Sequence, residues 1–184
     1  MSGGQAGAAT PTVDPCDGRG GALVIEGYAS LWGVADLNGD VVARGAFDRS
    51  VAAAGARGVR MLHQHESRSA IGVWDEMRED DRGLWVQGRI MDWSAEARFA
   101  QALSRAGALD GLSIGFRSQR ARRDGRLRVL VEVELWEVSL VTFPMLPAAR
   151  FSVTSQKSAP TRGRRLTGFG EPEAGRSRSV ARRA

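Results

Sequence analysis

The stretch LRVLVEVELWEVSLVTF, residues 127–143, is the longest strand signal in the chain and decides the fold class. Successive side chains of a strand point to opposite faces, which gives one apolar face made of Leu127, Val129, Val131, Val133 and Leu135. The same alternation places Glu137 on that face, between the apolar neighbours Trp136 and Val138. The strand is therefore predicted to be bulged, or buried on both sides, at Glu137. Its carboxylate needs a partner there, for which an arginine in a structural ion pair is one candidate.

Five further stretches have strand patterns and two have helix patterns. The strand patterns cover residues 22–33, 59–67, 69–77, 82–91 and 111–116. One helix is predicted over residues 45–55, with Gly55 as its stop. The second starts after the N-cap Ser94 and ends before Gly107, with the apolar stripe Phe99, Ala102, Leu103 and Ala106. Many short strands with two helices predict a mainly β fold (α+β), in which helices lie outside a closed or strongly curved sheet.

Composition predicts one folded domain between two polar ends. The formal charge is +5, but residues 152–184 hold eight basic and two acidic groups, a net of +6 that leaves −1 for the rest. We expect a disordered leader over residues 1–21, a folded domain over 22–151 and a basic disordered tail over 152–184. Such a tail is usually solvated, and binding to a polyanion such as nucleic acid is the alternative.

Several classes of protein are disfavoured by the same inspection. No stretch approaches the roughly 20 apolar residues of a membrane span, and the first residues do not resemble a secretory signal. The single cysteine, Cys16, cannot form an internal disulfide and is typical of a reducing compartment. Both histidines lie in HQHES, residues 63–67, where His63 and His65 could supply two metal ligands. No further His or Cys cluster accompanies them, so neither a metal site nor a cofactor is predicted.

The stretch GLSIGF, residues 111–116, supplies a candidate nucleophile. Ser113 lies opposite the apolar side chains of this predicted strand, with Gly111 and Gly115 two residues to either side. Glycine inside a strand indicates a bulge, a bend or the close approach of another chain. A serine hydroxyl needs a base to remove its proton, and an imidazole oriented by a carboxylate serves best. Ser113, Glu137 and His65, which is one of the two imidazoles available, offer these three groups, although spacing alone does not bring them together.

Five segments in order along the chain resemble the prohead (capsid maturation) serine proteases of tailed phages and gene transfer agents. They are GYASLWGVADLNGDVVARGAF, MLHQHESRSAIGVW, GLWVQGRI, GALDGLSIGF and LWEVSLVTFPMLPAAR, within residues 24 to 151. The resemblance implies Ser113 as the nucleophile, His65 as the base and Glu137 as the acidic member. Glu66 departs from the aspartate that is commoner in the family.

What the resemblance implies is an assemblin-like β-barrel surrounded by a few helices, acting inside the immature capsid in the bacterial cytoplasm. Its substrate would be the scaffolding segment of the major capsid protein or a separate scaffold protein, followed by the enzyme itself. A portal contact and a homodimer are expected by analogy only. Gly111, Gly115 and Arg117 are predicted to bind the substrate as an extended peptide.

Two other classes of function stay open at this point. One is a non-catalytic capsid-assembly factor whose basic tail binds DNA. The other is a small-molecule serine hydrolase, which is disfavoured because the chain has no GxSxG nucleophile elbow.

Overall fold

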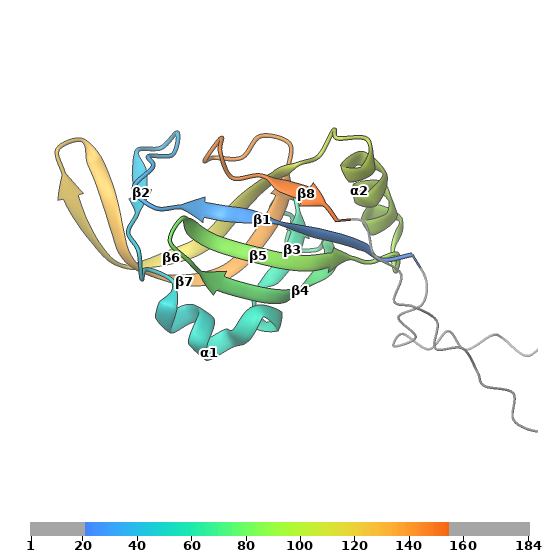
Figure 1. Ribbon diagram of the computed structural model, residues 1–184, viewed down its shortest axis with the longest axis horizontal. Coiled ribbons are helices and arrows are strands. Elements are labelled where there is room, and N and C mark those ends of the chain that lie inside the picture. Colours follow the sequence, from blue (N-terminus) through green and yellow to red (C-terminus); the bar gives the residue numbers. More distant parts are fainter. Residues whose placement is uncertain (1–20, 155–184) are drawn as a thin grey trace, which may run out of the picture.

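An eight-stranded sheet forms the body of the protein, in a computed structural model that describes residues 21–154 (Figure 1). The strands are β1 (Leu23–Leu31), β2 (Asp40–Val42), β3 (Arg60–His63), β4 (Ala70–Glu79), β5 (Gly83–Ile90), β6 (Gly111–Asp124), β7 (Leu127–Val141) and β8 (Phe151–Val153). The helices are α1 (Asp48–Gly58) and α2 (Ala95–Arg105). Nearly all of the predicted leader and tail lies outside the described residues.

The order of the strands makes the sheet curl until its ends meet. Hydrogen-bonded neighbours follow the order β2-β7-β3-β4-β5-β1-β8. In addition, β6 pairs with β7 along nearly its whole length. An isolated bridge joins Gly111 to Arg150, immediately before β8, and the amide of Leu112 donates to the carbonyl of Ala149 at 2.9 Å. β8 thus connects β1 to the start of β6, which confirms the predicted strongly curved sheet.

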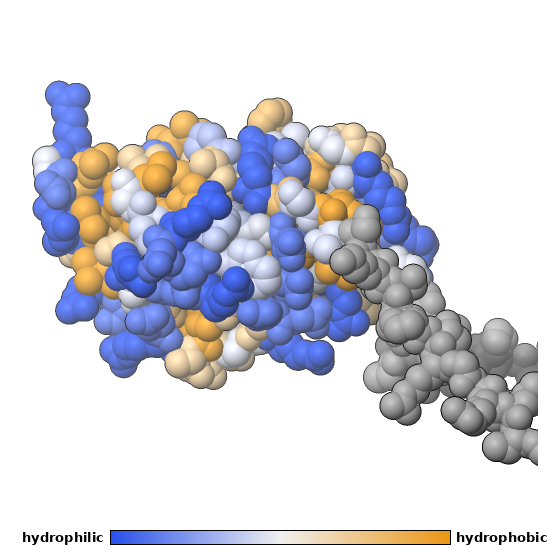
Figure 2. Space-filling model, viewed as in Figure 1, coloured by the Kyte–Doolittle hydropathy of each residue, from blue (hydrophilic) through white to orange (hydrophobic). Residues whose placement is uncertain are grey.

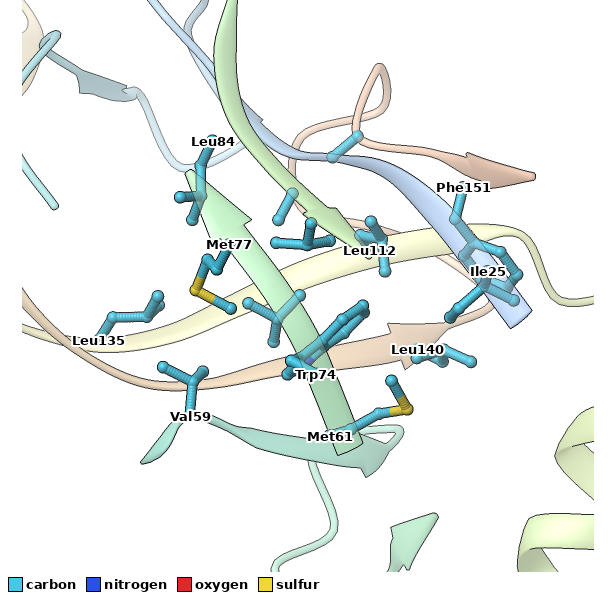
Figure 3. Close-up of a cluster of buried hydrophobic side chains, with 14 of the residues drawn as sticks. Ile25, Val59, Met61, Trp74, Met77, Leu84, Leu112, Leu135, Leu140 and Phe151 are labelled. Atoms are coloured by element: carbon cyan, nitrogen blue, oxygen red, sulfur yellow. The ribbon is translucent and has the colours of Figure 1, made fainter. Parts of the chain in front are cut away.

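The core fills the inside of this curl. Trp74, Ile25 and Leu84 come from different strands and are fully buried, as are Leu112 and Leu140 on β6 and β7. Figure 3 shows these side chains converging between the strands. Outward-facing residues of β5 such as Gln87 and Arg89 stay partly exposed, and hydrophilic residues dominate the middle of that face in Figure 2. The alternation of burial along β5 fixes which face of the sheet points inward.

The first helix lies outside the sheet, against β4 and β7 (Figure 1). Its helical geometry is interrupted at the predicted stop, Gly55, where φ is +62°, but a further turn continues to Gly58. The amides of Gly45 and Phe47, just before the helix, both donate to the Glu79 carboxylate at 2.8 Å. Burial nevertheless raises the pKa of Glu79 above its ordinary value, because these bonds only partly offset desolvation.

The second helix confirms its predicted cap but not its predicted stripe. Ser94 Oγ accepts a hydrogen bond from the amide of Ala97 at 3.0 Å. The residues that face the sheet are Ala97, Ala100, Gln101 and Ser104, whereas Phe99 is 55% exposed, so the stripe prediction is wrong. The Gln101 amide donates to the carbonyls of Gly21, Ile90 and Met91, and these bonds compensate the burial of a polar side chain.

Two local features differ from the sequence pattern. The strand predicted over residues 111–116 is longer than its pattern, because β6 continues through the arginine-rich stretch as far as Asp124 by pairing with β7. Two residues assigned to the tail, Ser152 and Val153, belong to β8. Neither helix of the part that the structure describes is long and apolar enough to cross a membrane.

Candidate active site

His65 and Glu137 are hydrogen-bonded, although 71 residues separate them in the chain. Nδ1 of His65 lies 2.8 Å from Oε1 of Glu137. The contact follows from the parallel pairing of β3 with β7, which places Arg60 beside Glu137 and His63 beside Leu140. The Glu137 side chain is only 15% exposed, and the imidazole that it holds is 41% exposed. The partner that the sequence demanded for Glu137 is therefore a histidine rather than an arginine.

The imidazole is presented by an unusual turn. β3 ends at His63, and the next two residues, Gln64 and His65, have φ angles of 52° and 61°. Residues with a Cβ rarely adopt this left-handed region, and such conformations concentrate at functional sites. The turn carries His65 out of the line of the strand and over β7.

The two histidines of this segment bind different partners. Nδ1 of His63 binds the carboxylate of Glu96 on α2, and its ring packs edge-on against Phe99. His63 and His65 thus bind different carboxylates on different elements, so the idea of two ligands on one strand face is wrong. Within residues 21–154 no group of three or more His, Cys, Asp or Glu side chains could hold a metal ion.

Glu137 sits at a β-bulge, as the break in alternation predicted. Gly115 pairs with Glu137 and the next residue, Phe116, pairs with Leu135, so Trp136 is the extra residue. Trp136 is 53% exposed, and on either side of it the core-facing residues are Leu135 and Val138, so the alternation shifts by one residue. The bulge therefore places Glu137 on the side of β7 opposite the core and removes it from the apolar face that the pattern predicted.

A second hydrogen bond fixes the Glu137 carboxylate. Oγ of Ser139 donates to Oε2 of Glu137 at 2.8 Å, and Ser139 is fully buried. Ser139 was not among the predicted site residues, although its position two residues after Glu137 on one strand gave a signal. Both oxygens of Glu137 thus have a partner, one in Ser139 and the other in His65.

Ser113 lies on the same face of the β6–β7 pair. It pairs with Ser139 across the strands, so it is diagonal to Glu137. Ser113 and His65 both line one pocket of about 290 Å³. The other walls come from β1, β2, β7, the loop between β1 and β2, and the loop before β8, with Val34, Leu112 and Met145 among the apolar contributors. The serine and the imidazole therefore open onto a common space, with Glu137 behind the imidazole.

The two glycines beside Ser113 have an intramolecular reason to lack a side chain. A Cβ at Gly115 would lie 2.3 Å from Oε1 of Glu137, and one at Gly111 would lie 2.5 Å from the carbonyl oxygen of Val141. The close approach that glycine indicates at these two positions is thus made within the sheet, by Val141 and Glu137. Peptide binding to the backbone groups of the two glycines stays a prediction.

Arg117, the third predicted substrate-binding residue, points elsewhere. Its Nε lies 3.5 Å from Oε2 of Glu134 on the outer part of the β6–β7 hairpin, and the side chain is 63% exposed. The pocket instead contains an ion pair that sequence reasoning did not predict. Arg128 Nε donates to Asp40 Oδ1 at 2.7 Å, and this bond ties β7 to β2 in the lining of the pocket.

Comparison with solved structures supports an assemblin-like fold. The capsid assembly protease of bacteriophage T4 superposes with a TM-score of 0.53 at 16% identity, over 64% of this chain and 80% of the other. The KSHV protease, solved with a hexapeptide phosphonate inhibitor, gives a TM-score of 0.51 at 12% identity, over 73% of this chain and 66% of the other. Both likenesses concern the fold, and the predicted architecture is confirmed.

Comparison of sequences identifies the family. The prohead protease of Enterobacteria phage HK97 is 33% identical over 134 residues, which cover 70% of this chain and 57% of that relative. The chain thus spans little more than half the length of this relative. The family model described as caudovirus prohead serine protease matches residues 10–163. On this match the chain belongs to the caudovirus prohead serine protease family.

Proposed function

We propose that the protein is a serine endopeptidase of prohead maturation, with Ser113 as nucleophile, His65 as general base and Glu137 as the carboxylate that orients the imidazole. The observation that carries the proposal is the 2.8 Å contact between His65 Nδ1 and Glu137 Oε1, beside a pocket that His65 shares with Ser113. An ionised carboxylate accepts hydrogen bonds only, so Nδ1 carries the proton and Nε2 is left free to act as a base.

The first half of the reaction forms an acyl-enzyme. Ser113 Oγ attacks the carbonyl carbon of the scissile peptide bond while its proton passes to Nε2 of His65. Glu137 stabilises the imidazolium through the Nδ1 hydrogen bond, and Ser139 holds the carboxylate in place. The tetrahedral intermediate then expels the amine, which takes the proton from Nε2 as the C–N bond breaks.

The second half returns the enzyme to its starting state. A water molecule attacks the ester carbonyl and gives a proton to Nε2, which passes it to Ser113 Oγ as the ester bond breaks. Desolvation of the nucleophile favours this chemistry, and Ser113 is only 7% exposed.

The substrate that fits this pocket is an extended polypeptide with apolar side chains. Val34 and Met145 are 43% and 40% exposed, and both line the pocket with Ser113. Such exposed apolar groups beside a nucleophile offer contacts to side chains of an unfolded segment. Because the chain belongs to the prohead protease family, we assign as substrate the scaffolding segment of the major capsid protein, or a separate scaffold protein, within the immature capsid. The portal contact, nucleic-acid binding by the basic tail and the homodimer stay predictions.

Co-expression with the major capsid protein of the same phage-like element tests the proposal. We expect wild-type enzyme to yield a shortened capsid subunit by intact mass, and Ser113→Ala and His65→Ala to yield none. We also expect the enzyme itself to lose part of its chain after Phe151 only when Ser113 is present. Equal masses with wild type and Ser113→Ala, together with equal changes in particle yield, would instead favour a non-catalytic assembly factor.

A further inference from the structure

The residue before the catalytic imidazole is held in a costly conformation by contacts that core packing does not explain. Gln64 and His65 are the only residues other than glycine with positive φ in the part of the chain that the structure describes. Both side chains lie on the surface, so no buried apolar contact compensates for the left-handed backbone at these positions. The amide of Glu66 donates to the carbonyl of His63 at 3.0 Å and closes the turn, and further contacts hold the turn from outside.

The contacts of Gln64 supply the restraint. Its backbone amide donates to the carbonyl of Leu140 at 2.9 Å. Its side-chain Nε2 donates to Oγ1 of Thr142 at 2.8 Å, and the amide of Thr142 donates back to Gln64 Oε1 at 3.4 Å. One glutamine side chain therefore bonds both the hydroxyl and the backbone of a single residue, which directly follows the last residue of β7.

The position of these contacts relates them to the imidazole. β7 carries Glu137, which binds His65, and Leu140, which binds Gln64, and Thr142 directly follows the end of this strand. The imidazole and the residue before it are thus anchored to one strand at successive points. We call the hydrogen bonds between Gln64 and Thr142 the Gln64 tether. Loss of this tether would let the turn relax toward negative φ, and that movement would carry His65 away from Glu137.

We propose that Gln64 is a positioning residue, which acts with Thr142 to hold His65 in the left-handed conformation that aligns its imidazole between Glu137 and the pocket of Ser113. This inference rests on the proposed function for its catalytic consequence. The geometric part concerns the His65–Glu137 bond and can be measured without any substrate.

Substitutions at Gln64 and Thr142 separate the effect of their hydrogen bonds from the preference of residue 64 for positive or negative φ. Thr142→Val keeps the shape and removes the hydroxyl, whereas Thr142→Ser keeps the hydroxyl. Gln64→Gly relieves the left-handed strain but removes the side chain, and Gln64→Asn also tolerates positive φ but is one methylene too short to span the same contact. Gln119→Asn is a matched control, because this exposed amide bonds Glu134 at 2.8 Å on the outer hairpin.

The first readout is the tautomer of His65, followed by ¹⁵N NMR of the imidazoles at a pH where both are neutral. The chain has only two histidines, so His63, bound to Glu96, serves as an internal reference. We expect wild type, Thr142→Ser and Gln119→Asn to keep the proton on Nδ1 of His65. We expect Thr142→Val, Gln64→Gly and Gln64→Asn to move His65 toward the other tautomer and to leave His63 unchanged.

The second readout is the kinetics of peptide cleavage. Misplacement of a catalytic group by about 1 Å can cost up to about 100-fold in rate, so Thr142→Val and Gln64→Gly should lower kcat by roughly 10- to 100-fold with KM nearly unchanged. Thr142→Ser should restore kcat. An unchanged His65 tautomer in Thr142→Val overturns the proposal, as does full kcat in Gln64→Gly. Absence of cleavage by wild type would contradict the proposed function alone, and the NMR comparison would still support or overturn the tether.

Discussion

Gly115 and Glu137 face each other across β6 and β7, and the glycine leaves the space that the carboxylate fills. A Cβ built on Gly115 would lie 2.3 Å from Oε1 and 2.4 Å from Cγ of Glu137. A Cβ atom essentially never makes nonbonded contacts this short, so a side chain at position 115 must displace Glu137. The glycine beside the candidate nucleophile therefore serves the acidic member of the site.

Gly115→Ala is expected to lower kcat by about 100-fold, because the displaced carboxylate no longer orients His65. The clash should also lower the thermal stability of Gly115→Ala. In the double variant Gly115→Ala with Glu137→Asp, the shorter aspartate makes room for the methyl group, so its melting temperature should be higher than that of Gly115→Ala alone. If Gly115→Ala retains wild-type kcat on a peptide substrate, the packing account of this glycine is wrong.

Glu137→Gln should reduce kcat by roughly 10²- to 10⁴-fold and leave measurable activity. The amide can no longer stabilise the imidazolium, but Ser113 and His65 can still react slowly as a pair. The pH profile of kcat/KM and the residual rate provide the measurement. Full activity would remove Glu137 from the site.

Ser139→Ala should lower kcat by about tenfold with little change in KM. It removes the hydroxyl that donates to Glu137 at 2.8 Å and leaves an uncompensated carboxylate oxygen. Ser104→Ala is the control, since this buried serine donates to the carbonyl of Ala100 on α2, outside the site. An equal effect of the two substitutions on kcat would argue against a role for Ser139 in the site.

Asp80 is expected to contribute a pH-dependent part of the stability. Desolvation raises the pKa of Asp80, but hydrogen bonds from Tyr28 and from the amides of Arg82 and Gly83 outweigh it and hold the pKa below its ordinary value of 3.8. A carboxyl group with a lowered pKa in the folded state stabilises the fold above the unfolded pKa. That stability is lost as the pH falls through the folded pKa.

Asp80→Asn should therefore reduce the free energy of unfolding at neutral pH by roughly 1 kcal/mol, given the exposure of the group. The difference from wild type should shrink as the pH falls below about 4, the ordinary range of an aspartate. Urea unfolding of wild type and Asp80→Asn at neutral and acid pH measures this difference in the free energy of unfolding. Asp81→Asn is the control, because Asp81 forms only an exposed pair with Arg44. If the difference between wild type and Asp80→Asn grows as the pH falls, the pKa of Asp80 is not lowered by folding and the prediction is wrong.

The sequence predicted Glu137 as an anomaly because strand alternation is a local rule. A carboxylate on an apolar face must be bulged and partnered, and both features are present at Glu137. The partner of Glu137 could not be predicted from nearby residues, since His65 reaches it only because β3 pairs in parallel with β7, more than 70 residues away in the chain. The resemblance to a family, rather than any pattern in the residues, singled out His65 over His63.

The parts of the fold that were missed have polar residues in structural roles. Gln101 was overlooked on the buried face of α2 because a count of apolar residues cannot anticipate its three carbonyl partners. The outer part of β6 is exposed and arginine-rich, and its strand conformation depends only on pairing with β7. Gln64 and Thr142 are likewise unremarkable in sequence, since only the folded turn brings them together.

Labelling with a fluorophosphonate tests most directly whether Ser113 is activated by His65. The reagent reacts with a serine whose proton is removed by a neighbouring base, and peptide mass mapping locates the modified residue. We expect wild type to be modified at Ser113, and His65→Ala to react far more slowly although it keeps the same fold. Modification at another serine, or an equal rate in His65→Ala, would contradict the account.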